Sequence, residues 1–193
     1  MSISRLKTLK TMTVLLALSA LPAVVAADSY TIDPSHTYPN FKIDHLGFSI
    51  LHGRFGKTSG RFSMDRARGS GSVDIVIDAA SIDTGHAKRD DHLRSPDFFN
   101  VVEFPRITFT SNTVKYVGDG ATVTGDLTIL GVTRRVTLEV PRINCGTHPF
   151  NKKYVCGFNA TTRFKRSDFG MNYGLPGIGD EVSLEIEVEA FKD

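Results

Sequence analysis

Tryptophan is absent from this sequence of 193 residues, and cysteine occurs only twice, at Cys145 and Cys156. Redox and metal sites that use cysteine pairs favour the tighter Cys-x-x-Cys spacing, whereas these two cysteines lie 11 positions apart. In an oxidising compartment, such a pair is typical of a disulfide that closes a hairpin loop. A ring of this size contributes about 3 kcal/mol through the entropy of the unfolded chain. The sequence therefore predicts a structural disulfide.

Long hydrophobic runs are also lacking, apart from one near the N-terminus. Three basic residues precede an apolar stretch at residues 11–21, and residues 25–27 then supply the small side chains that a signal peptidase reads. The stretch is about half as long as the roughly 20 residues that a membrane-spanning helix needs. We therefore expect residues 1–27 to be a cleaved signal peptide and residues 28–193 to form one domain in the periplasm.

Neither sign of charge dominates the sequence. The chain has 23 basic and 21 acidic residues, and three of the bases but none of the acids lie within residues 1–27. Residues 28–193 therefore carry 20 bases against 21 acids, and no basic patch favours binding to nucleic acid. A Gly-x-Ser-x-Gly motif is missing, and the expected disulfide leaves no free thiol. We therefore expect a protein that is not an enzyme.

Long amphipathic helices and internal repeats are missing too, and short segments with alternating apolar and polar residues take their place. In the clearest case, Val182, Leu184, Ile186 and Val188 alternate with polar residues, mostly glutamate. Such patterns indicate half-buried strands, and we expect about eight of them. Since no helical layer is available to cover their apolar faces, closing the sheet into an antiparallel barrel would bury these faces and remove the sheet edges. A two-sheet sandwich is the alternative.

One polar segment, residues 81–100, interrupts the alternation. It has helical character and holds two histidines, three cationic residues and four aspartates. We expect a short helical plug around residues 85–100 that covers one end of the barrel. On a helix His92 points away from Asp90, so the segment is a poor metal site and we expect no bound metal. Arg89, Asp90 and His92 are instead expected to hold the plug to the barrel rim, with contact to a ligand head group as the alternative.

The same segment carries a motif that resembles a known family. Thr84 to Asn100 resembles the pattern T-x-x-x-x-R-D-x-H-L-x-S-x-D-F-F of the YceI-like family, the lipocalin-like polyisoprenoid-binding proteins. Other matches follow in the family's order along residues 28–193, and they include Ile32 to His36, Gly53 to Phe55, Phe109 to Ser111, Gly125 to Thr128, Gly131 to Thr133 and Arg166 to Met171. The hairpin between the two cysteines is not a general feature of that family.

The resemblance implies an all-β fold, an eight-stranded antiparallel lipocalin-like β-barrel with a long apolar channel. It also implies one bound long-chain amphiphile, which is a polyprenyl lipid, an isoprenoid quinone, or a fatty acid or fatty amide. It implies neither catalytic activity nor a cofactor. Each buried methylene contributes about 0.8 kcal/mol, whereas association costs on the order of 4–15 kcal/mol. A chain that buries roughly 15–20 carbons therefore binds tightly, while a short chain barely offsets that cost.

Ligand-binding residues are expected on the inward faces of the strands and on the plug. The set is Phe41, Ile43, His45, Phe55, Phe62, Ile75, Ile77, Arg89, Phe98, Phe99, Ile107, Phe109, Leu127, Ile129, Leu138, Phe158, Phe169, Leu184 and Ile186. The same side chains could simply pack as core, so a structural barrel with a filled interior is one alternative. A lipid-modifying enzyme that uses His36, His45, His86 or His92 as acid or base is another.

Outside the channel, the sequence supports fewer assignments. Arg166 to Gly170 is interpreted as a turn that its own Ser167 and Asp168 side chains cap, and no chemistry is assigned to it. We expect the lipid to exchange with an inner-membrane partner. The oligomeric state stays open, with a dimer as one option.

Overall fold

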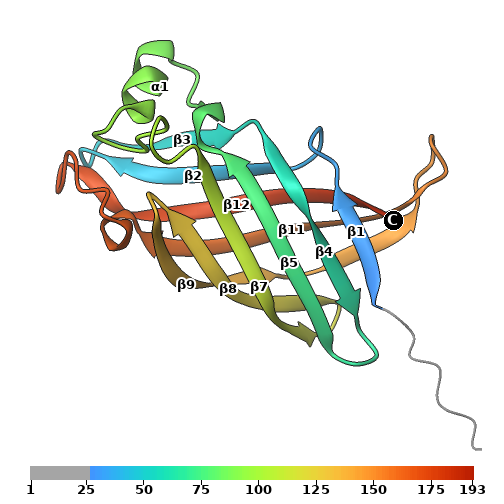
Figure 1. The fold of residues 1–193 in the computed structure, drawn as a ribbon. Helices are drawn as coiled ribbons and strands as arrows, with labels where there is room; N and C mark the ends of the chain where they lie inside the picture. The colour runs from blue at the N-terminus through green and yellow to red at the C-terminus, as the bar shows by residue number, and fades with distance from the viewer. Residues whose placement is uncertain (1–26) are drawn as a thin grey trace, which may run out of the picture.

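The structure is a computed structural model that describes residues 27–193 (Figure 1). The expected signal peptide therefore lies outside the described residues, apart from Ala27. The described range contains twelve strands, one α-helix and two short 3-10 helices. The strands are β1 (Asp28–Ile32), β2 (Tyr38–His45), β3 (Ser49–Phe55), β4 (Thr58–Asp65), β5 (Ser70–Asp78), β6 (Ile82–Asp83), β7 (Arg106–Val117), β8 (Gly120–Ile129), β9 (Val132–Val140), β10 (Ile143–Thr147), β11 (Tyr154–Lys165) and β12 (Ile178–Lys192). The helices are η1 (Ala79–Ser81), α1 (Ala87–Arg94) and η2 (Arg166–Phe169).

Eight of these strands close into an antiparallel barrel. The ring runs β1, β4, β5, β7, β8, β9, β11 and β12, and the pairing of β12 with β1 completes it. One edge of β12 pairs with β11, and the other edge pairs with β2 and then with β1. The strands β2, β3 and β6 therefore extend the wall on the side where α1 lies (Figure 1). The predicted eight-stranded barrel is confirmed, and the two-sheet sandwich is wrong.

The strands place apolar side chains inside the barrel because successive residues of a strand face opposite ways. In β12, Leu184 and Ile186 line the interior, whereas Glu185 between them forms an ion pair with Lys42 on the outer surface. The largest cluster of buried apolar residues lies beside α1 and includes Phe55, Phe98, Ile107 and Phe169. A second cluster, which contains Tyr30, Phe62 and Cys156, packs farther from α1.

Two glycines make room for phenylalanine rings against the barrel wall. Gly53 of β3 pairs with Phe41 of β2, and a Cβ atom at Gly53 would lie 2.3 Å from Cζ of that ring. A Cβ atom at Gly125 of β8 would lie 2.6 Å from Cζ of Phe109. The absence of a side chain therefore lets both rings lie over the neighbouring backbone, where they form part of the inner wall.

The plug lies at one end of the barrel, as the sequence predicts, and its helix is α1. Asp90 is buried, and its carboxylate accepts hydrogen bonds from the N–H and hydroxyl of Thr84, just after β6. Arg89 donates to the Thr84 hydroxyl and carbonyl, both at 2.7 Å, and Arg94 donates to the Ile82 carbonyl at 2.9 Å. His92 bonds Asp97 within the plug itself instead of the rim. No helix in residues 27–193 is long and apolar enough to cross a membrane.

The predicted disulfide is present between Cys145 of β10 and Cys156 of β11, which lie directly opposite each other. In the described fold β10 is an edge strand that pairs with β11 alone. The bond therefore ties an edge strand to the barrel, next to the buried cluster that contains Cys156.

Candidate functional site

The interior of the barrel is hollow and contains two adjacent cavities. The cavity beside α1, here called the mouth cavity, has a volume of about 290 Å³, and the one farther inside, the deep cavity, has about 120 Å³. Pro39, Ile77, Leu127 and Leu184 line both, so the two cavities adjoin, and together they are called the channel. The mouth cavity alone is roughly twice the ~150 Å³ of an engineered apolar cavity that binds benzene. The alternative of a barrel with a filled interior is therefore wrong.

Every residue predicted to bind a ligand lines this channel. The mouth cavity is lined by Phe41, Ile43, His45, Phe55, Ile77, Arg89, Phe98, Phe99, Ile107, Leu127, Ile129, Phe169 and Leu184. The deep cavity is lined by Phe62, Ile75, Phe109, Leu138, Phe158 and Ile186, and again by Ile77, Leu127 and Leu184. The period-two pattern thus identifies which side chains face inward, while their contact with a ligand stays a prediction.

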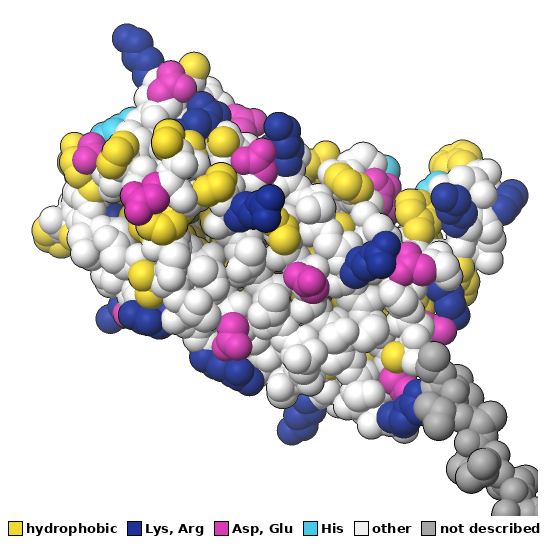
Figure 2. Space-filling view, in the orientation of Figure 1, with side chains coloured by type: hydrophobic (Ala, Val, Ile, Leu, Met, Phe, Trp, Pro, Cys, Tyr) yellow, Lys and Arg dark blue, Asp and Glu magenta, His cyan; other side chains and the backbone are white. Residues whose placement is uncertain are grey.

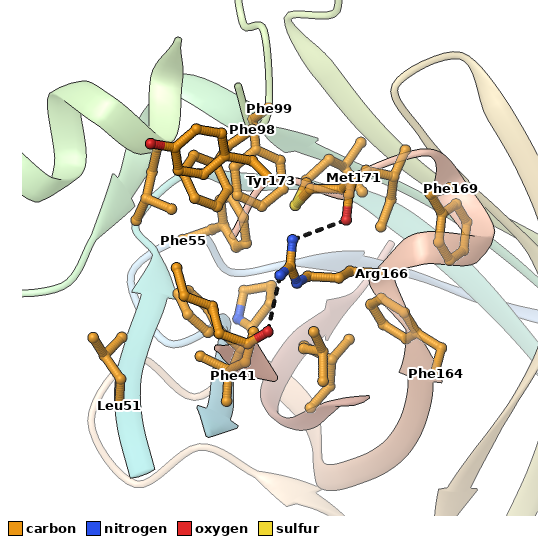
Figure 3. A pocket seen from close by; sticks show the side chains of 18 of the residues that line it. Phe41, Leu51, Phe55, Phe98, Phe99, Phe164, Arg166, Phe169, Met171 and Tyr173 are labelled. Atoms are coloured by element: carbon orange, nitrogen blue, oxygen red, sulfur yellow. Dashed lines mark hydrogen bonds between the residues drawn. The ribbon is translucent and has the colours of Figure 1, made fainter. Parts of the chain in front are cut away.

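Aromatic side chains from several elements form the wall of the mouth cavity (Figure 3). Phe99 packs edge-on against Phe55 of β3, with ring centroids 5.4 Å apart. Phe98, His92 and Tyr173 pack against one another, and each pair of ring centroids is 5.1 Å apart. Because Tyr173 lies between η2 and β12, these contacts join the plug to the loop that connects those two elements.

Arg166 of η2 is the residue that the sequence interpretation missed. It is only 3% exposed and lines the mouth cavity (Figure 3). Its Nε, Nη1 and Nη2 donate to the carbonyls of Gly179, Met171 and Ile178 at 2.8, 2.8 and 3.1 Å. Burial lowers the pKa of the guanidinium, and the nearby Asp180 carboxylate acts in the opposite direction. Among described residues, no carboxylate oxygen lies within 4 Å of this cation, so a positive charge faces the channel.

The hydrogen bonds that hold the turn around Arg166 also differ from those expected from the sequence. The N–H and hydroxyl of Ser167 donate to Asp180 of β12 at 3.0 and 2.8 Å, and η2 has no side-chain cap of its own. The predicted capping by the Ser167 and Asp168 side chains is therefore wrong. The alternation could have indicated Arg166. Phe158, Ala160 and Phe164 are even-numbered positions that line the channel, and position 166 continues this series.

The cationic side chains of the channel are confined to the mouth. Arg89 and Arg166 line the mouth cavity together with His45 and His92, and the lining of this cavity holds no carboxylate, thiol or aliphatic hydroxyl among the described residues. The deep cavity is lined by no charged side chain from residues 27–193. Its polar groups include Thr58, a buried residue whose hydroxyl has no hydrogen-bond partner within the described chain. The channel therefore has a cationic end and a neutral, apolar end.

The four histidines considered for acid–base chemistry lie in different places. His45 and His92 line the mouth cavity, and Nε2 of His92 lies 2.9 Å from an Asp97 carboxylate oxygen. His86 caps α1, where its Nδ1 accepts from the Arg89 N–H. His36 bonds Asp33 in the β1–β2 turn and lines neither cavity of the channel.

Relatives of known sequence match nearly the whole described chain. A family model, the YceI-like domain, matches residues 30–190. Protein YceI of Escherichia coli O17:K52:H18 is 44% identical over 170 residues, which cover 86% of this chain and 88% of that protein. Protein YceI of Salmonella arizonae has the same identity and coverage.

Solved structures share the barrel. BcnA of Burkholderia cenocepacia has a TM-score of 0.73 at 26% identity, over 82% of this chain and 98% of that one. The YCEI protein of Campylobacter jejuni has a TM-score of 0.65 at 30% identity, over 78% and 90% of the two chains. A polyisoprenoid binding domain from Saccharophagus degradans has a TM-score of 0.62 at 19% identity, over 85% and 98%, which shows a shared fold. By its matching sequence and its barrel, this chain belongs to the YceI-like family.

Proposed function

We propose that this protein binds one long-chain isoprenoid lipid, a polyprenyl lipid or an isoprenoid quinone, inside the barrel. The observation that carries the proposal is a hollow apolar channel that is charged at one end only. Apolar walls favour a hydrocarbon chain in proportion to the area that it buries, at about 0.8 kcal/mol per methylene. A structural neighbour described as a polyisoprenoid binding domain supports this class of ligand.

The charge distribution also sets the direction in which the lipid enters. The apolar tail occupies the deep cavity, where no described residue brings a charge. The head group stays in the mouth cavity near Arg89 and Arg166, whose guanidinium groups lack a carboxylate partner in the described chain. Guanidinium groups form strong hydrogen bonds with phosphate oxygens and also donate to carbonyl oxygens, so both a polyprenyl phosphate and a quinone suit this end.

Binding without turnover fits the arrangement better than catalysis does. Among the described residues at the mouth, His92 and Asp97 form the one acid–base pair, and both side chains are at least 44% exposed. No serine, threonine or cysteine lines the mouth cavity in the described chain, so a nucleophile of those types is missing beside the pair. We therefore assign His92 to the aromatic packing of the rim rather than to chemistry on the lipid.

A periplasmic site of action is supported by two features. The N-terminal sequence has the order of a signal peptide, and the Cys145–Cys156 disulfide fits an oxidising compartment. There the protein would shield an insoluble lipid from water and exchange it with a membrane partner.

The test is organic extraction of protein purified from its native host, followed by mass spectrometry. We expect one isoprenoid species at about one molecule per chain. A fatty acid or fatty amide at the same ratio would assign the channel to that other class of ligand. Recovery of no lipid from folded protein that retains its disulfide would contradict the proposal.

A further inference from the structure

Five exposed apolar side chains gather on two neighbouring loops at the mouth of the barrel. Phe48 is 89% exposed at the tip of the β2–β3 turn, and Leu46 and Ile50 beside it are each 53% exposed. Tyr173 and Pro176 are exposed on the loop between η2 and β12. We call these five residues the rim patch. In Figure 2, hydrophobic side chains gather at this end of the molecule, beneath α1.

The two loops form one continuous surface. The Leu46 N–H donates to the Gly177 carbonyl at 2.8 Å, and His45 pairs with Ile178 across the β2–β12 ladder. Residues 46–51 and 170–179 contain no acidic, basic or histidine side chain. A surface that is exposed, apolar and free of charge over two adjoining loops is unusual for a soluble domain and marks an interaction site.

This surface leads directly into the channel. Leu51 and His45, which flank the β2–β3 turn, line the mouth cavity, and so does Tyr173. Tyr173 is 47% exposed and packs against Phe98 of the plug, so it belongs both to the outer surface and to the cavity wall. Apolar surface therefore continues from the rim patch into the wall of the mouth cavity, where Arg89 and Arg166 also lie.

We propose that the rim patch docks the protein onto the surface of a lipid bilayer. The inference goes beyond the proposed function but rests on it, because a bound isoprenoid is exchanged with the membrane in which such lipids dissolve. Docking by this patch places the mouth cavity against the bilayer, so the lipid tail passes between two apolar environments. Phenylalanine, leucine and tyrosine on projecting turns suit the boundary between head groups and acyl chains.

A bilayer fits this patch better than a folded protein partner does. Phe48 stands at the tip of its turn and is almost completely exposed, and Tyr173 is the one residue of the rim patch that lines the mouth cavity. Protein interfaces combine an apolar centre with a rim of hydrogen-bonding groups, whereas these loops offer few polar side chains. A surface without charged side chains avoids the cost of bringing ions toward the acyl chains.

The experiment is flotation of the purified protein with phosphatidylcholine vesicles that contain no isoprenoid. The same measurement is made on the Phe48→Ser variant and on the triple variant Leu46→Ser, Phe48→Ser, Ile50→Ser. Fully burying one phenylalanine is worth on the order of tenfold to a hundredfold in partition. We therefore expect at least a tenfold loss of vesicle binding for Phe48→Ser alone and near-complete loss for the triple variant.

Phe150→Ser is the matched control. Phe150 is 88% exposed in the β10–β11 loop, which lies at the other end of the barrel and next to Lys152 and Lys153 (Figure 1). This variant should bind vesicles as the unmodified protein does. Equal effects of the two substitutions would overturn the proposal, because they would show unspecific adhesion.

The outcome is separable from that of the proposed function. If the extracted protein contains an isoprenoid but does not float with vesicles, docking is wrong and lipid binding stands. If Phe48→Ser instead converts a dimer into a monomer without any vesicle binding, the patch is an interface between copies of this chain, and docking is again wrong. Phe48-dependent flotation of protein that contains no lipid would support docking while contradicting the proposed ligand.

Discussion

Arg166 connects the loop after η2 to the first residues of β12. Its guanidinium donates to three backbone carbonyls, those of Met171, Ile178 and Gly179, and this loop carries Tyr173 at the mouth. A buried cation is tolerated where hydrogen bonds replace its hydration. The same side chain therefore has a structural role and supplies positive charge to the channel.

Replacing Arg166 by methionine should destabilise the fold strongly. Three carbonyls would lose their donor, and each buried unsatisfied group costs about 1–3 kcal/mol. We expect a loss of at least about 3 kcal/mol in the free energy of unfolding, measured by urea denaturation. Arg89→Gln is the matched control, because Arg89 donates only to Thr84 and is half-buried. A loss as small as that of the control would contradict the role given to Arg166.

At the residue scale, periodicity predicted the channel lining but missed its buried cation. The inward side chains of β8 and β12 follow from alternation alone, since their neighbours are threonine, serine, aspartate or glutamate. In β7 a register shift between Thr110 and Thr113 changes which positions face inward, so alternation predicts only part of this strand. Arg166 has the same parity as Phe164, yet its residue type favours an exposed turn. Its hydrogen-bond partners are carbonyls 5 to 13 positions away in the sequence, and a local pattern of residue types does not predict where those carbonyls lie in the fold.

At the element scale, η2 is fixed to β12 through Asp180. Burial acts to raise the pKa of this carboxyl, but the Ser167 N–H and hydroxyl that donate to it outweigh burial and lower the pKa below its usual value. A carboxyl with a lowered pKa stabilises the folded state above its unfolded pKa, and this contribution is lost as the pH falls through the folded pKa. The mouth should therefore loosen in acid.

Asp180→Asn tests this linkage. We expect the variant to melt at a lower temperature than the unmodified protein at pH 7, because the amide binds Ser167 more weakly than a carboxylate does. The gap should shrink as the pH falls below about 4, since the carboxyl of the unfolded chain takes up a proton there and the folded carboxyl follows only at its lower pKa. Thermal unfolding across this pH range measures it. A gap that stays constant with pH would show that the charge of Asp180 does not matter.

The disulfide holds an edge strand whose loss need not open the channel. Only β11 pairs with β10 in the described fold, and the eight-stranded ring does not include β10. Reduction should lower the free energy of unfolding by up to about 3 kcal/mol, measured in urea with and without dithiothreitol. The amount of lipid bound per chain should be the same in the reduced, folded protein as in the oxidised protein. Ile143 is the one residue of β10 that lines the deep cavity. Loss of lipid on reduction, with the fold intact, would show that the channel wall depends on the disulfide to hold this residue in place.

For the plug, the sequence predicts the position and the type of the element but not its contacts. Its place between two runs of alternating residues and its helical character were both predictable. The way in which α1 is attached was not predictable. Asp90 and Arg89 both form hydrogen bonds with Thr84, which precedes the helix and has the sequence pattern of an ordinary loop residue. His92 has the right residue type for the rim network but faces Asp97 and the aromatic rings instead.

At the scale of the whole molecule, closure of the sheet was predictable but the size of the hollow was not. Closure follows from many apolar strand faces and no helical layer to cover them. The cavity volume is the small difference between the space inside the ring and the side chains that fill it, and eight strands suit either a packed or a ligand-binding interior. Residues such as Gly53 and Gly125 decide that difference locally, because rings lie against their backbone instead of across the channel.

The channel as a whole should select lipids by length, and Leu184→Trp tests this property. Leu184 lies where the two cavities adjoin, so a bulky indole there should close the passage to the deep cavity. Each isoprene unit excluded from the deep cavity forfeits five carbons, about 4 kcal/mol, or roughly a thousandfold in affinity. Short prenyl analogues that fit the mouth cavity should keep their affinity, while long ones should lose at least that factor.

The absence of tryptophan from the natural sequence makes the measurement direct. The new indole is the only one in the chain, and its fluorescence should change when a short analogue enters the mouth cavity. Ser183→Trp is the control, because residue 183 lies next to Leu184 on β12 but faces away from the channel and lines neither cavity. Its fluorescence should not respond to ligand, and its affinity for long chains should be unchanged. If long and short lipids lost affinity equally in Leu184→Trp, the two cavities would not act as one channel, and length selection along the barrel would be wrong.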